Sequence, residues 1–315
     1  MQIIAEFCQN HNGDFEVLKD MIFLAKENGA NYGKIQNIFA DNLTLRKRFE
    51  NGLIENNIVK VIKRPYESEY ERLKKLELSY ELQADFIEIC RKVNLKPLTT
   101  IFSRDSLKKI ISIGFKDIKI ASYDCASEPL IRDVSSNFNH IFVSTGATFD
   151  KEIRLASSLL KDCDFTFFHC VTKYPTPLEE FNLKRMNYLR KFTNSVGWSD
   201  HSLVKRDGIK GTLAAIFYGA DFIERHFTIL PSSKTKDGPI SITPKQLKDL
   251  VEFSKLDQKE KKIYLNEHFP DHSICLGMEK RKLSSEELLN RDYYRGRFAS
   301  FLNEKIIYNW EDKNI

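Results

Sequence analysis

Short β-rich runs and amphipathic helical runs alternate along most of this chain, and that alternation limits the fold more than any other feature. Eight runs have the length and composition of strands. These strands are expected at residues 3–8, 32–36, 97–102, 118–122, 141–144, 165–170, 195–201 and 220–228. Helices are expected after them at 15–27, 81–93, 105–113, 129–134, 151–160, 183–191, 204–218 and 244–255. Repeated strand–helix units predict a parallel sheet.

Eight repeats over roughly 250 residues match the size of a closed (β/α)₈ TIM barrel. The predicted fold class is therefore α/β, a TIM barrel with a short C-terminal tail. An open doubly wound sheet is the alternative. Such a sheet ordinarily has a glycine-rich phosphate loop after its first strand, and the loop at 10–13, Asn-His-Asn-Gly, is not one. The charged segment 38–80 is expected to be an insertion at one rim.

Composition excludes several classes of protein. Charged residues make up 30% of the chain and the net charge is +5, but both signs are interspersed, so nucleic-acid binding has little support. The six cysteines form no C-x-x-C pair, which favours reduced thiols in a cytoplasmic protein. The sequence has no apolar run of ~18 residues, so we expect no membrane span. The first residues lack the features of a signal peptide.

Polar residues gather where the predicted strands end. The active site of a TIM barrel lies at the carboxyl ends of its strands. A charged residue in a core strand is costly unless it is paired or used. These residues therefore predict one site, formed by Glu6, Lys34, Gln36, Thr100, Ser103, Lys119, Ser122, Ser144, Thr145, His169, Ser199, Asp200, His201, Glu224, Arg225 and His226.

Two histidines lie in consecutive predicted strands, near their carboxyl ends. His201 closes the run SVGWSDH and His226 interrupts the run ADFIERHFT, with one helix between the two strands. A parallel strand–helix–strand unit places both strand ends on one face. Two neutral imidazoles beside carboxylates suit a divalent transition metal. The alternative is a pair of histidines that only form hydrogen bonds in a polar strand end.

Eight short motifs occur in one order: AEFCQNHNG, KIQ, TTIFS, KIAS, STG, HCVTKYPTP, GWSDH and ERHFT. Each is weak alone, but in this order and spacing, from about residue 2 to residue 255, they resemble the sialic acid synthase family. That family comprises N-acetylneuraminate synthase and its pseudaminic and legionaminic acid relatives. The resemblance implies condensation of phosphoenolpyruvate with an amino sugar aldehyde, usually N-acetylmannosamine or a derivative, to a nine-carbon 2-keto acid and phosphate.

The resemblance also implies a role for each matching residue. His201 and His226 correspond to the ligands of a divalent metal, typically Mn²⁺, with Mg²⁺ or Co²⁺ as alternatives. Glu6, Lys34 and Lys119 are the expected catalytic residues. The phosphate and carboxylate of phosphoenolpyruvate are expected to contact the two lysines and Thr100, Ser122, Ser144 and Ser199. The sugar is expected to contact Gln36, Asp124, Tyr174 and Asp237.

Several of these residues have a structural alternative. The alternative for Lys34 and Lys119 is a structural ion pair with Glu6 or Glu224 in place of a catalytic role. Tyr174 can be a core aromatic residue. His169 is left without a role beyond a supporting hydrogen bond, Cys170 is expected to pack rather than react, and Arg225 is expected to pair with Asp200.

The sequence departs from the family pattern in two places. Asp124 stands where many members have glutamate, which leaves the identity of the acceptor open. Members usually carry a C-terminal antifreeze-like domain that lends an arginine to the partner subunit. Here residues 1–258 are expected to form the barrel, and 259–315 a linker and short tail without a complete antifreeze-like domain. Arg295 or Arg297 is expected either to reach a neighbouring subunit or to belong to a tail that only seals the dimer.

The sequence is compatible with three functions. The first is the synthase, a homodimer by resemblance. The second is the same chemistry on a different or phosphorylated sugar. The third is a sugar-binding relative without turnover, against which His201, His226, Lys34 and Lys119 argue, since a pure binder needs no metal.

Overall fold

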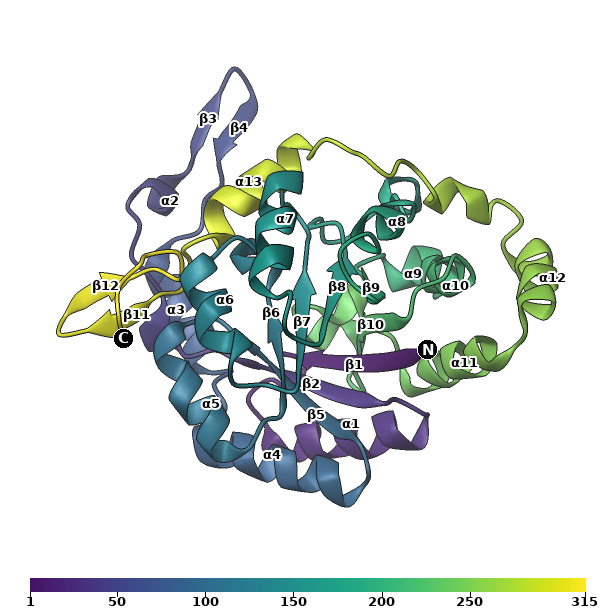
Figure 1. The fold of residues 1–315 in the computed structure, drawn as a ribbon, viewed down its shortest axis with the longest axis horizontal. Coiled ribbons are helices and arrows are strands. Elements are labelled where there is room, and N and C mark those ends of the chain that lie inside the picture. Colours follow the sequence, from purple (N-terminus) through teal and green to yellow (C-terminus); the bar gives the residue numbers. More distant parts are fainter.

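A closed barrel of eight parallel strands forms the centre of the molecule in the computed structural model, which describes residues 1–315 (Figure 1). The order around the barrel is β1-β10-β9-β8-β7-β6-β5-β2, and β1 pairs with β2 to close it. The predicted TIM barrel is confirmed, and the open sheet is excluded. The barrel strands are β1 (Gln2–Cys8), β2 (Tyr32–Asn37), β5 (Lys96–Ile101), β6 (Asp117–Ile120), β7 (His140–Ser144), β8 (Phe165–His169), β9 (Ser195–Asp200) and β10 (Phe222–His226).

Helices follow the strands and cover the outside of the barrel (Figure 1). Their apolar sides and the outer faces of the strands form one large core. The expected helix at 204–218 is broken, because Gly208 adopts φ 57° and ψ −125°, a conformation open to glycine alone. The helices are α1 (Phe15–Glu27), α4 (Tyr80–Lys92), α5 (Leu107–Ile113), α6 (Glu128–Ser135), α7 (Asp150–Leu159), α8 (Arg185–Leu189), α9 (Val204–Asp207), α10 (Lys210–Phe217) and α11 (Pro244–Lys255).

Short 3₁₀ turns connect many of these elements, and several lie in the loops at the carboxyl ends of the strands. One of them, η3, carries Ser122 and Asp124 directly after β6. The turns are η1 (Ala40–Asn42), η2 (Arg104–Ser106), η3 (Ser122–Asp124), η4 (Leu178–Glu180), η5 (Ser232–Lys234), η6 (Gly238–Ile240) and η7 (His272–Cys275).

The barrel interior is layered, because every second strand residue points inward. A small buried cluster separate from the main core fills the middle of the barrel. Two residues further along most of these strands the side chain is polar, so the apolar cluster forms a floor under the polar groups. This aromatic floor consists of Ile4, Tyr32, Leu98, Phe142, Phe168 and the partly buried Phe222.

The segment 38–80 is the rim insertion that the sequence predicts. It contains two helices, α2 (Arg48–Asn51) and α3 (Tyr66–Lys74), and a hairpin of β3 (Leu53–Glu55) and β4 (Ile58–Val61). The hairpin projects away from the barrel (Figure 1). Its two-residue turn, Asn56-Asn57, has positive φ at both positions, as a tight hairpin requires.

The C-terminal residues return to the barrel. After α12 (Gln258–His268) the chain reaches α13 (Ser285–Tyr294), which lies beside α7 (Figure 1). An antiparallel hairpin of β11 (Ser300–Leu302) and β12 (Lys305–Ile307) follows. Ser284 starts α13 with a capping box that includes Glu287. No helix in the molecule is both long and apolar enough to cross a membrane.

Gly197 tests the packing of the aromatic floor. A Cβ at this position would overlap the ring of Phe168. We expect Gly197→Ala to lower the free energy of unfolding by roughly 1–3 kcal/mol, the usual cost of overpacking a core. Urea unfolding measures this, with Ser158→Ala on the exposed face of α7 as the control. A variant as stable as the wild type would show that the floor has space to spare.

Candidate active site

Four charged side chains meet directly above the aromatic floor. Lys34 Nζ lies 2.6 Å from Glu224 Oε2 and also pairs with Glu6 Oε2. Lys119 Nζ lies 2.5 Å from the same Glu224 oxygen and 4.5 Å above the centre of the Phe168 ring. All four are at most 5% exposed. The ion pairs that the sequence offered as a structural alternative are therefore present.

The ion pairs alter how each group titrates. Burial lowers the pKa of Lys119 to about 8, although Glu224 opposes that shift. Burial acts on Lys34 in the same direction, but Glu224 and Glu6 outweigh it and raise its pKa. The two ammonium groups likewise overcome burial at Glu224 and lower its pKa, whereas burial prevails at Glu6 and raises its pKa. Lys119 is thus the less firmly held cation of the two.

The strand register explains why these groups meet. Glu6 is paired with Lys34 on one side and with His226 on the other. Glu224 is the register partner of Ser199, whose hydroxyl donates to Glu224 Oε1 over 2.8 Å. Because the strands of a closed barrel tilt relative to its axis, register partners rise in steps around the barrel, and inward residues of different strands meet in layers.

Two imidazoles lie one step higher, at the carboxyl ends of β9 and β10. The His201 and His226 rings are 5.7 Å apart between centres. His201 Nδ1 lies 3.0 Å from the Val171 carbonyl oxygen, which fixes Nδ1 as the donor and leaves Nε2 with its lone pair. Burial lowers the pKa of His201 to about 3, so the ring is neutral. His226 Nδ1 is buried without a partner.

A thiol and a carboxylate flank His226, and only the carboxylate was predicted for the site. Cys8 Sγ lies 3.0 Å from Asp237 Oδ2. Ligand atoms of Cys8, His226 and Asp237 all lie within 4.8 Å of one another. Neutral imidazole, thiol and carboxylate are suitable donors for a divalent transition metal. The donor set therefore fits the metal that the sequence predicts.

The predicted phosphate-binding hydroxyl groups lie around the lysines. Thr100, at the end of β5, is the register partner of both Gln36 and Lys119. Ser122 Oγ accepts a hydrogen bond of 3.1 Å from the Gly146 amide, and it lies 3.3 Å from Cys170 Sγ. Thr100 therefore lies beside Lys119 in the sheet, and Ser122, Ser144 and Ser199 are buried at or just after the ends of other strands.

The predicted acceptor residues are spread around the barrel mouth. Asp124 is buried in η3, Gln36 and Asp237 are half-buried, and the Tyr174 side chain is 52% exposed. The Tyr174 ring lies 4.2 Å from the His201 ring between centres. Tyr174 is thus an exposed residue that covers His201, and the core aromatic alternative is wrong.

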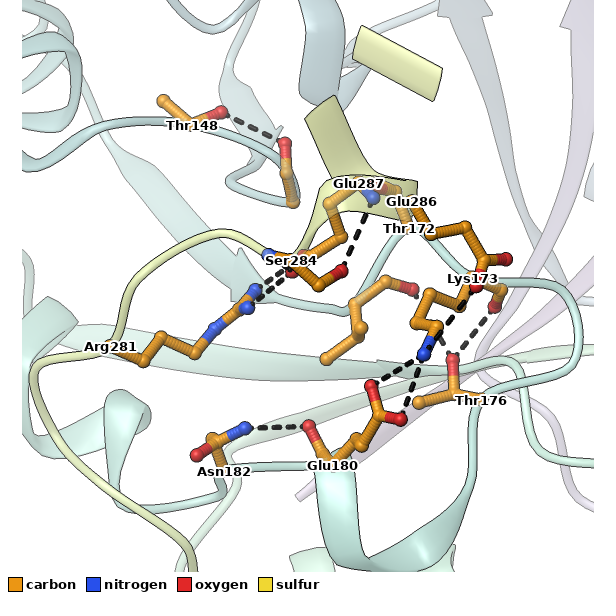
Figure 2. Close-up of polar contacts among 12 residues, drawn as sticks. Thr148, Thr172, Lys173, Thr176, Glu180, Asn182, Arg281, Ser284, Glu286 and Glu287 are labelled. Carbon is orange, nitrogen blue, oxygen red and sulfur yellow. Dashed lines mark hydrogen bonds and ion pairs between the residues drawn. The ribbon is translucent and has the colours of Figure 1, made fainter. Parts of the chain in front are cut away.

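Ion pairs fix the loop that carries Tyr174. Lys173 Nζ lies 2.8 Å from the Glu180 carboxylate and 3.5 Å from Glu286 of α13 (Figure 2). Thr176 donates to the Lys173 carbonyl oxygen over 2.8 Å, within the same loop. The close-up also shows Arg281 and Ser284 holding Glu287, which anchors the start of α13 (Figure 2). The β8 loop and the C-terminal helix therefore support each other.

The C-terminal tail contributes a residue that the sequence did not indicate. Asn309 is 2% exposed, and its Nδ2 donates to Asp124 Oδ1 over 3.0 Å and to the Phe102 carbonyl oxygen over 2.9 Å. Tyr294 of α13 stacks on Tyr123 with the ring centres 5.0 Å apart. Residues separated by more than 150 positions thus form one wall of the acceptor side.

The two arginines of the tail lie within their own chain. Arg297 is buried and pairs with Glu69 of α3, and its guanidinium lies 4.6 Å from the centre of the Phe298 ring. Arg295 lies 3.4 Å from Glu152 and over Trp310. That Arg295 or Arg297 reaches a neighbouring subunit stays a prediction, and Arg297 would have to leave a buried carboxylate to do so.

Three minor predictions are also settled by contacts. Arg225 pairs with Asp200, and both are fully buried, as expected. His169 Nε2 lies 2.7 Å from the Phe181 carbonyl oxygen, which is a supporting hydrogen bond. Cys170 is buried beside Ser122, in keeping with packing.

A family model described as the NeuB family matches residues 21–262. The chain belongs to the NeuB family. It is therefore an enzyme of the phosphoenolpyruvate-dependent, carbon–carbon bond-forming type, and the resemblance to sialic acid synthases is confirmed. The matched region includes every barrel strand except β1, so it contains both lysines and both imidazoles.

Two curated relatives and one solved structure illustrate the likeness. N,N'-diacetyllegionaminic acid synthase of Legionella pneumophila is 34% identical over 259 residues, 79% of this chain and 70% of that protein. Pseudaminic acid synthase of Helicobacter pylori is 30% identical over 93% of this chain and 80% of that protein. The N-acetylneuraminic acid synthetase structure from Leptospira borgpetersenii has a TM-score of 0.69 and 28% identity, covering 92% of this NeuB-family chain and 90% of its own.

The buried carboxyl of Asp124, which accepts the hydrogen bond from Asn309, gives a pH-dependent test of that contact. Burial raises its pKa to about 6, against the ordinary value of 3.8. A raised carboxyl pKa contributes stability that is present below pH 3.8 and lost as the pH rises through about 6. We expect Asp124→Asn, which keeps an oxygen for Asn309, to be more stable than the wild type near neutral pH by up to roughly 3 kcal/mol.

Thermal unfolding at about pH 7.5 and about pH 4 measures this difference. The two proteins should converge at the lower pH, where the wild-type carboxyl is protonated. A stability difference that is the same at both pH values would contradict the raised pKa.

Proposed function

We propose that this protein condenses phosphoenolpyruvate with an N-acyl amino sugar aldehyde, resembling N-acetylmannosamine, to give a nine-carbon sialic-acid-type 2-keto acid and phosphate. The observation that carries the proposal is the meeting of two buried lysines with two buried imidazoles at the carboxyl end of the barrel. Membership of the NeuB family and relatives named as synthases of such acids support the same reaction.

Phosphoenolpyruvate is assigned to the lysine side. Its phosphate and carboxylate are strongly anionic, and Lys34 and Lys119 supply two cations in a site that excludes water. Hydroxyl groups and the backbone amides of the strand ends supply further donors. Glu224 holds both ammonium groups in place before substrate binds. The residues assigned to this substrate are Lys34, Thr100, Lys119, Ser122, Ser144 and Ser199.

The metal is assigned to the imidazoles. His201 and His226 are its proposed ligands, with Mn²⁺ as the expected ion. A divalent ion there supplies Lewis-acid stabilisation of the oxygen that gains negative charge during carbon–carbon bond formation. The burial and neutrality of His201 suit a ligand, and its Nδ1 hydrogen bond to Val171 presets the ring orientation.

Glu6 is assigned to the attacking water. The C3 carbon of phosphoenolpyruvate adds to the aldehyde carbon, water adds to C2, and the tetrahedral adduct then releases phosphate. Burial raises the pKa of Glu6. Glu6 Oε1 accepts a hydrogen bond from the Cys8 backbone amide, so a residue of the same strand orients the carboxylate. A general base with a raised pKa is suited to removing a proton from that water.

The acceptor is assigned to the wall made by Asp124, Gln36, Tyr174 and Asp237. Asn309 is a positioning residue in this proposal, because its amide holds the Asp124 carboxylate. We also propose that residues 1–258 form the synthase domain and that 259–315 form a linker and tail, which closes this wall. The six free cysteines support a cytoplasmic location, and the family resemblance supports a homodimer.

Phosphate release tests the reaction directly. With phosphoenolpyruvate, an N-acyl mannosamine-type aldehyde and Mn²⁺, we expect phosphate in proportion to a 2-keto acid product, and none after chelation. His226→Ala should lower kcat/KM by about 100-fold or more, as expected for a lost metal ligand. His268→Ala on the exposed face of α12 is the control. Equal phosphate release with and without metal would refute the metal assignment.

Asn309→Ala tests the acceptor wall separately. Loss of the amide leaves the buried Asp124 carboxylate without one hydrogen bond, which costs roughly 1.5–3 kcal/mol when the acceptor is charged. The KM of the aldehyde should therefore rise about 10-fold or more, while the KM of phosphoenolpyruvate stays the same. Lys305→Ala at the exposed start of β12 is the control. An equal rise in both KM values would indicate a general structural effect instead.

A further inference from the structure

The imidazole pair does not account for all of the donor atoms at the end of β10. Cys8 Sγ, a ring nitrogen of His226 and a carboxylate oxygen of Asp237 lie within 4.8 Å of one another. They come from β1, β10 and the loop after β10, so three separate backbone segments converge there. Cys8 and His226 are buried and Asp237 is half-buried.

The backbone at Cys8 is held in a conformation that disfavours a side chain. Its φ is 47°, in the left-handed region, where a Cβ comes too close to the neighbouring backbone. The register with β2 also shifts between Glu6 and Cys8. Irregularities of this kind are typical of positions where a strand aims a side chain at a functional site. Glycine would relieve the strain, yet the chain has a thiol here.

His226 supplies the second, independent observation. Its side chain is 7% exposed, and Nδ1 is buried without any hydrogen-bond partner. Buried polar atoms in native proteins nearly always have a partner, so this nitrogen is suited to a ligand. The Cys8 thiol donates its hydrogen to Asp237 Oδ2 over 3.0 Å, but that contact leaves the imidazole nitrogen unsatisfied.

We propose that Cys8 and Asp237 bind the same divalent ion as His226 and His201. The site then has one sulfur, two nitrogen and one oxygen donor, and a thiolate ligand favours Co²⁺, Zn²⁺ or Fe²⁺ over Mg²⁺. On binding, the thiol S–H bond breaks, its proton passes to solvent, and a sulfur–metal bond forms with no change of oxidation state. This inference rests on the proposed metal-assisted condensation and assigns Asp237 to the ion instead of the sugar.

Cobalt titration of the metal-free full-length protein tests the sulfur ligand. A thiolate bound to Co²⁺ gives a charge-transfer band in the near ultraviolet that imidazole and carboxylate ligands do not give. We expect this band in the wild type and its loss in both Cys8→Ser and Cys8→Gly. Cys170→Ser, which removes a different buried thiol near the site, should keep the band.

Calorimetry supplies a readout that does not depend on the band or on turnover. Both Cys8 variants should bind Co²⁺ about 10-fold or more weakly, whereas their Mg²⁺ affinity should change little. Cys8→Gly suits the positive φ and so guards against a folding defect in the serine variant, and circular dichroism checks the fold.

The possible results separate this inference from the proposed function. Wild-type protein that binds Co²⁺ without the band would overturn the sulfur ligand and leave the metal-dependent reaction intact. A band that persists in both Cys8 variants would overturn it as well. Wild-type protein that binds no Co²⁺ or Mn²⁺ at all would overturn both this inference and the metal assignment on which it rests.

Discussion

The site depends on four charges that neutralise one another inside the barrel. Lys34 and Lys119 are balanced by Glu6 and Glu224, and the aromatic floor below them keeps out water. Removing one member of a buried pair usually costs roughly 3–5 kcal/mol, because the remaining charge has no solvent to stabilise it. The cluster therefore fixes the ammonium groups before an anion arrives. A phosphate that enters the site would therefore meet two oriented ammonium groups. It would compete with the Glu6 and Glu224 carboxylates for hydrogen bonds from them.

The level of a residue along its strand decides its chemistry. In β10, Phe222 belongs to the floor, Glu224 to the charge cluster and His226 to the metal donors, each two residues after the last. β1 repeats the pattern with Ile4, Glu6 and Cys8. Because inward residues recur every second position, they form stacked layers. The aromatic floor is lowest, the charge cluster lies above it, and the proposed metal donors lie at the mouth. In the proposed function, this arrangement would place the phosphorylated substrate deep and the carbonyl acceptor near the opening.

That period is also why so much could be predicted from the sequence. The strands, most helices and the convergence of Lys34, Lys119, His201 and His226 follow from local pattern and from the rule that barrel sites lie at the carboxyl ends of strands. The broken helix at Gly208 was missed because an apolar pattern at helical spacing continues across it. Cys8 was missed because its role depends on a positive φ and on contact with Asp237, 229 positions away. Asp207-Gly208 is a turn dipeptide that could have marked the break, whereas neither the φ of Cys8 nor its contact with Asp237 has a signal in the local sequence.

Asn309 shows the other limit of sequence reasoning. It lies in a polar tail with no periodic pattern, and only the folded chain shows that its amide reaches Asp124, 185 positions away. The contact has a physical consequence for the acceptor side. A buried carboxylate with few partners is costly when ionised, and the tail supplies a donor that partly offsets this cost. The tail is therefore coupled to the charge state of the acceptor wall. In the proposed function, the wall assigned to the sugar therefore depends on two contacts from outside the barrel, the Tyr294 ring of α13 on Tyr123 and the Asn309 amide of the tail on Asp124.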